Sequence, residues 1–63
     1  MTLKTIIKKW ADITETSKVN LYNLKGELIC SGAALPMVRA FPVYHIKRFQ
    51  KVEDEFDIII YRP

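Results

Sequence analysis

Residues 22–32, YNLKGELICSG, have the pattern of a β-hairpin. Asn23 suits the first position of a type I turn, and Gly26 suits the fourth, where φ must be positive. The stretch therefore predicts a three-residue loop closed by a glycine bulge, which fixes the register of the flanking strands. The expected cross-strand pairs are Asn23 with Glu27, Tyr22 with Leu28, Leu21 with Ile29, and Asn20 with Cys30.

The predicted hairpin is apolar on both of its faces. Alternate side chains of a strand point to opposite sides of a sheet. The two sets are Val19, Leu21 and Ile29 on one face, and Tyr22, Leu28 and Cys30 on the other. One amphipathic helix covers only one face of a sheet, so the sequence raises the question of what covers the second.

Before the hairpin, apolar residues recur every three or four positions, which predicts an amphipathic helix over residues 3–13. Thr2 is placed to cap its first turn. The residues on its apolar side are Leu3, Ile6, Ile7, Trp10 and Ile13. This N-terminal helix is expected to lie across one face of the sheet.

After the hairpin, Pro36 and Pro42 bracket a short helical turn at about residues 36–41. Residues 43–61 then predict a second hairpin with its turn near residues 53–55, because β-branched and aromatic residues dominate. A helix over residues 43–52 stays open as an alternative, since Val43, Ile46, Phe49 and Val52 recur at every third position.

Together these elements predict an α+β fold in one domain of 63 residues. The N-terminal helix packs on a four-stranded, mainly antiparallel sheet, built from two hairpins with a short helical turn between them. If that turn folded back over the second face, the monomer would be closed. If it did not, several large apolar side chains would remain in water, each worth roughly 1.5–3 kcal/mol on burial.

Composition points to a small folded protein without cofactor or metal. Ten Lys and Arg stand against seven Asp and Glu, a formal charge of +3, and 49% of the residues are hydrophobic. Cys30 is the single cysteine, so it forms no internal disulfide, and with His45 alone beside it there is no set of four zinc ligands. No apolar run approaches the length of a membrane span, and we expect a cytoplasmic protein.

No residue pattern indicates catalysis, so we do not expect an enzyme. His45 has no Ser or Cys at a spacing that marks a nucleophile. The two glycines fall at strand ends and form no phosphate-binding loop. The acidic run at residues 53–57 does not match a calcium loop and can be neutralised by the basic strand that faces it.

The order of a short amphipathic helix, the YNLKGEL hairpin, an LP-containing turn and a terminal FDIIIY strand resembles small uncharacterised proteins of phages and conjugative elements of Gram-positive bacteria. The resemblance implies no catalytic residue and no cofactor. It implies an accessory protein that binds a host protein or one encoded by the element, and that acts as an inhibitor.

Our leading functional expectation is a non-enzymatic module that binds a protein partner or a second copy of itself through the uncovered sheet face. The expected contact residues are Tyr22, Leu28, Cys30 and Tyr61. The alternative is a nucleic-acid-binding accessory protein, with cations on phosphates and rings on bases. Its expected contact residues are Tyr44, Lys47, Arg48 and Lys51, together with Lys8 and Lys9.

Overall fold

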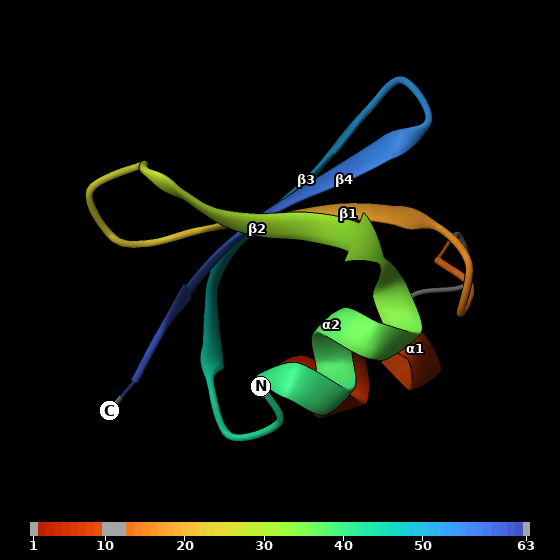
Figure 1. The fold of residues 1–63 in the computed structure, drawn as a ribbon, viewed down its shortest axis with the longest axis horizontal. Helices are drawn as coiled ribbons and strands as arrows, with labels where there is room; N and C mark the ends of the chain where they lie inside the picture. Colours follow the sequence, from red (N-terminus) through yellow and green to blue (C-terminus); the bar gives the residue numbers. More distant parts are fainter. Residues whose placement is uncertain (1, 10–12, 63) are drawn as a thin grey trace.

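The computed structural model of the protein describes residues 2–9 and 13–62. The helical elements are a 3-10 turn, η1 (Leu3–Thr5), and two α-helices, α1 (Ile6–Lys9) and α2 (Ala34–Ala40) (Figure 1). The strands are β1 (Lys18–Tyr22), β2 (Leu28–Ala33), β3 (His45–Val52) and β4 (Glu55–Tyr61). They form one four-stranded sheet, which confirms the predicted α+β class.

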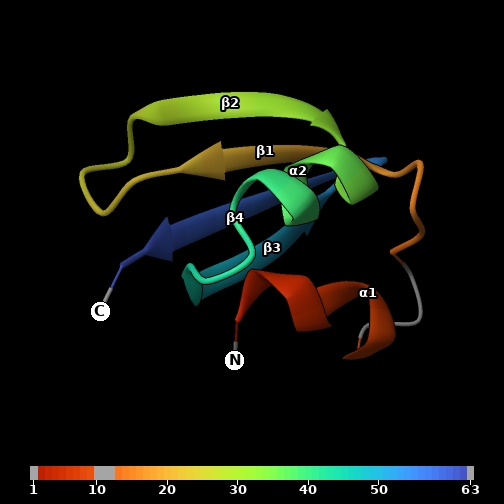
Figure 2. The ribbon, with the colours of Figure 1, turned by 60° about the horizontal axis from the view of Figure 1, so that its bottom comes forward.

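The sheet has the strand order β2-β1-β4-β3 and is mixed. Both expected hairpins are present, because β1 pairs antiparallel with β2 and β3 pairs antiparallel with β4. The two hairpins join through β1 and β4, which run parallel at the centre. The parallel pair arises because the chain crosses from the edge strand β2 through α2 to the opposite edge strand β3 (Figure 2).

Residues 45–52 form the strand β3, so the helical alternative for residues 43–52 is wrong. The three-residue recurrence that suggested a helix came from a strand with a bulge between Ile46 and Arg48. That extra residue shifts the alternation and places Ile46 and Phe49 against the same core.

The expected N-terminal helix over residues 3–13 is wrong in its extent. The chain begins with a 3-10 turn in which the Thr5 amide donates to the Thr2 carbonyl at 3.1 Å, and the Thr5 hydroxyl donates to the same oxygen at 2.8 Å. Thr2 makes no side-chain cap. Ile13 is buried but lies outside α1, and the expected Trp10 contact lies outside the described residues. The longest helix of the described residues is α2.

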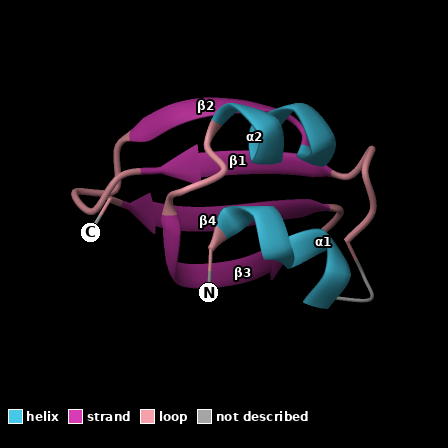
Figure 3. Ribbon diagram, turned by 90° about the horizontal axis from the view of Figure 1, so that it is seen from below, coloured by secondary structure: helices cyan, strands magenta, loops and turns pink. Residues whose placement is uncertain are grey.

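Both helices lie on the same face of the sheet (Figure 3). Ala34 and Val38 of α2 join one core with Leu3 and Ile6 from the N-terminal helical turns. The remaining buried members of this core are Ile13, Val19, Leu21, Phe56, Ile58 and Ile60. The alternative in which the short helix folds over the second face is therefore wrong, and the opposite side of the sheet is uncovered by the described helices.

Candidate functional site

The sheet face opposite the helices, here called the open face, carries the side chains that alternate with the buried ones. Cross-strand partners point to the same side of a sheet, so the register assigns each strand's contribution. Its members include Lys18, Asn20 and Tyr22 of β1, Leu28 and Ser31 of β2, His45, Arg48, Gln50 and Val52 of β3, and Glu55, Asp57, Ile59 and Tyr61 of β4.

One half of the open face is apolar. Tyr22 lies next to Ile59 in the parallel register and opposite Leu28 in the hairpin, and Tyr61 continues β4 beyond this row. We call these four residues the apolar half. Leu28 is 58% exposed. Three of the residues expected from the sequence to contact a partner, Tyr22, Leu28 and Tyr61, are thus brought together on one surface.

Cys30 does not belong to this surface, which corrects the sequence-based set. A bulge between Leu21 and Tyr22 in the β1–β2 ladder pairs Leu21 with Cys30 and leaves Ile29 as the extra residue. A one-residue shift turns a side chain to the other face. The Cys30 thiol accordingly donates to the sulfur of Met37 on α2, with 3.3 Å between the two sulfur atoms, while Ile29 is 41% exposed.

Ile59 was not among the contact residues expected from the sequence. Ile58, Ile59 and Ile60 are consecutive and equally apolar, so composition does not tell which of them face the helices. The β1–β4 register decides the matter, because Leu21 pairs with Ile58. Alternation of side chains along residues 56–61 left two possible sets for the uncovered face, Ile58 with Ile60 or Ile59 with Tyr61.

The other half of the open face is polar and internally satisfied. The side-chain amide of Asn20 donates one hydrogen bond to Glu55 Oε1 and one to Asp57 Oδ1, both at 2.9 Å. Lys18 Nζ lies 3.6 Å from Glu55 Oε1. The hydrogen bond from Asn20, followed by the charge of Lys18, holds the pKa of Glu55 below its ordinary value of 4.5.

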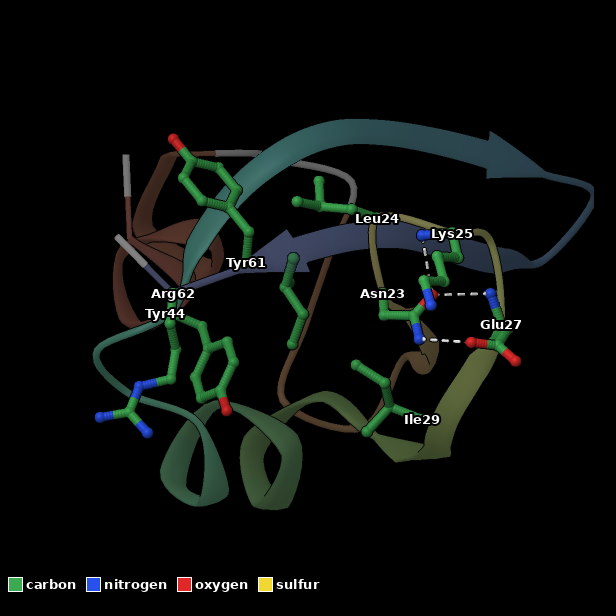
Figure 4. Close-up of a pocket in the computed structure, with 9 residues that line it drawn as sticks. Asn23, Leu24, Lys25, Glu27, Ile29, Tyr44, Tyr61 and Arg62 are labelled. Atoms are coloured by element: carbon green, nitrogen blue, oxygen red, sulfur yellow. Dashed lines mark hydrogen bonds between the residues drawn. The ribbon is translucent and has the colours of Figure 1, made fainter.

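A groove of about 440 Å³ adjoins the apolar half, at the end of the sheet where β1 turns away from β4 (Figure 4). Tyr44 and Tyr61 lie on the side of it that faces Leu24 and Lys25 of the β1–β2 turn. Its lining consists of Asn23, Leu24, Lys25, Glu27, Ile29, Tyr44, Ile60, Tyr61 and Arg62.

The wall of the groove formed by the β1–β2 turn is held by Asn23. Its Oδ1 accepts hydrogen bonds from the backbone amides of Lys25 and Glu27, both at 2.9 Å, and its Nδ2 donates to Glu27 Oε1 at 3.0 Å. The Gly26 amide donates to the Asn23 carbonyl at 2.9 Å. One side chain therefore fixes the conformation of the whole turn.

The residues of the nucleic-acid alternative do not share one surface. Arg48 belongs to the open face, whereas Lys51 pairs with buried Phe56 and its Nζ lies 5.7 Å from that ring. Lys47 lies at the β3 bulge, and Tyr44 packs edge-on against Phe41 with ring centroids 5.3 Å apart. Lys9 is exposed on α1, and the side chain of Lys8 lies outside the described residues.

The described side chains do not assemble a metal centre. Within residues 2–9 and 13–62, no group of three or more His, Cys, Asp and Glu side chains could hold an ion. His45 lies against Tyr61, with ring centroids 5.6 Å apart. In the same part of the chain, every helix is too short or too polar to cross a membrane.

Comparison of the chain with protein-family models, with curated proteins and with solved structures gives no match.

Proposed function

We propose that this protein is a non-enzymatic module that binds another protein chain through the apolar half of its open face. The observation that carries the proposal is the placement of both described helices on one side of the sheet, which leaves Tyr22, Leu28 and Ile59 facing away from the core. Burial of each such side chain contributes roughly 1.5–3 kcal/mol.

The composition of this surface fits a protein partner. Tyrosine and arginine are enriched at the centres of protein interfaces, and the apolar half holds two tyrosines with Arg48 directly opposite Ile59. The exposed Lys47 and Arg48 at its border would favour a partner with carboxylates around an apolar contact.

The nucleic-acid alternative is less well supported. Its aromatic and basic residues point to different sides of the sheet, and the polar half of the open face presents Glu55 and Asp57, which repel phosphates. A phosphate backbone needs a continuous row of cations, and the described residues do not form one across this face.

Site-specific photocrosslinking tests the proposal. Benzoylphenylalanine replaces Tyr22 in one variant and Glu15, an exposed loop residue outside the sheet, in the control. We expect protein adducts in cells at position 22 and not at position 15, and loss of the adduct when Leu28→Asp is added. Nucleic-acid adducts at position 22, equal protein adducts at both positions, or none at position 22 would overturn the proposal.

A further inference from the structure

We infer that the chain that covers the open face is a second copy of this protein, related by a twofold axis parallel to the strands. This inference rests on the proposed function and specifies its partner. It starts from the β1–β4 register, which sets unlike residues side by side across the midline of the open face. The three rows are Lys18 beside Glu55, Asn20 beside Asp57, and Tyr22 beside Ile59.

A twofold axis above this midline exchanges the two central strands. β4 of the second copy then lies over β1 of the first. Each β1 residue of a row therefore faces the β4 residue of the same row in the other copy. Asn20 faces Asp57 of the other copy, and Tyr22 faces Ile59 of the other copy. Isologous interfaces require such self-complementarity, because every contact occurs twice.

The charges of the open face favour this axis over a twofold axis that also lies between the two sheets but runs perpendicular to the strands. With the axis along the strands, Lys18 lies over Glu55 of the second copy, and Arg48 lies over Leu28 of the second copy. A twofold axis perpendicular to the strands and centred on the Tyr22 row would instead stack Arg48 on Arg48. Like charges in direct contact are costly, so the parallel axis is favoured.

The resulting assembly is a sandwich of two sheets with the helices on its outside. Two stacked sheets pack aligned at about 30°, so the rows nearest the middle of the sheet match best. Of these, Tyr22 with Ile59 supplies the apolar contact, while Asn20 already donates both of its amide hydrogens to Glu55 and Asp57 of its own chain. The groove is left outside this contact.

The size of the face predicts a weak, reversible dimer. The whole chain measures 25 × 21 × 17 Å along its principal axes, so its sheet face buries at most about 500 Å² per copy. Stable interfaces bury roughly 1,200–2,000 Å² in total, so this contact lies below that class. We expect a dissociation constant in the range of about 10 μM to 1 mM.

Sedimentation equilibrium of the purified chain tests the inference with a pair of complementary variants. Tyr22→Lys in one chain and Ile59→Glu in the other place unlike charges at positions that meet between two copies across the proposed axis. Each variant alone is expected to stay at the 7.4 kDa monomer mass at concentrations where the wild-type chain dimerises. An equimolar mixture is expected to regain the dimer, because the introduced lysine of one chain meets the introduced glutamate of the other.

Thr16→Lys adds the same charge as Tyr22→Lys at an exposed loop position, and it should dimerise like the wild type. Circular dichroism melts establish that all variants are folded. A wild-type chain that remains monomeric at 1 mM, single variants that dimerise normally, or a mixture that stays monomeric would each overturn the inference. If the wild type is monomeric but position 22 still crosslinks to a different protein, only the second copy is excluded and the proposed function stands.

Discussion

Asn20 links the two central strands through side chains as well as through the backbone. It is a neutral donor between two carboxylates, and its two amide hydrogens reach Glu55 and Asp57 at the same distance of 2.9 Å. The carboxylates of neighbouring rows would repel each other, and the shared donor reduces that repulsion. Its position on β1 therefore stabilises the acidic beginning of β4.

The lowered pKa of Glu55 predicts how stability depends on pH. A carboxyl whose pKa is lower in the folded state than in the unfolded state stabilises the fold fully above pH 4.5, and this contribution is lost as the pH falls through the folded value. Asn20→Ala removes the largest cause of the shift, so its free energy of unfolding should decline less between pH 6 and pH 3 than that of the wild type. Urea unfolding at several pH values measures this difference.

Gln50→Ala is the matched control, because it removes an exposed amide from the same face next to Asp57. Its pH dependence should parallel that of the wild type. A carbon-detected NMR titration gives the pKa of Glu55 directly, and an unchanged value in Asn20→Ala would contradict the assignment of cause.

Single residues also show where sequence reasoning about this surface succeeded and where it failed. The pairs of Asn23 with Glu27 and Tyr22 with Leu28 were predicted correctly, because turn chemistry fixes the register next to the loop. One residue further on, the bulge at Ile29 shifts the ladder and turns Cys30 toward α2. The bulge carries no local signal in LIC, where three apolar residues follow one another.

At the scale of the elements, the β3–β4 turn stores backbone strain. Val52 pairs with Glu55, so Glu53 and Asp54 alone connect the strands, and Glu53 has φ of 56°. Two-residue turns need positive φ, which is why Gly and Asn dominate them. The sequence offers neither, and the turn type could therefore not be predicted although the hairpin could.

Glu53→Gly should raise the free energy of unfolding by about 0.5–1 kcal/mol. Glycine removes the steric penalty of the left-handed conformation, which is roughly 1–2 kcal/mol for a residue with a Cβ, and part of this gain is lost to the greater freedom of the unfolded chain. Denaturant unfolding measures the change. Glu53→Ala keeps the strain while removing the charge, so it should not stabilise, and equal gains from Gly and Ala would show that charge, not backbone strain, is the cause.

At the scale of the whole molecule, the side on which α2 packs determines which sheet face is free. The chain leaves β2 at one edge and enters β3 at the other, and between them α2 packs on the face that α1 also covers. The sequence predicted four strands and two hairpins from local patterns. It could not predict the parallel centre or the side taken by α2, because both depend on contacts between residues distant in sequence.

The two-sidedness of the sheet predicts opposite outcomes for two aliphatic residues in the same sheet. Ile58 is 0% exposed and Leu28 is 58% exposed. Ile58→Ala should lower the free energy of unfolding by about 2–5 kcal/mol through lost burial and a cavity in the core. Leu28→Ala should change it by less than about 0.5 kcal/mol in dilute solution, where the protein is monomeric.

Urea unfolding at low protein concentration compares the two variants. A large loss of stability from Leu28→Ala in this experiment would mean that the monomer itself buries this residue. The distinction matters for function, because an apolar side chain that contributes little to the monomer's stability is free to contribute its burial to a complex.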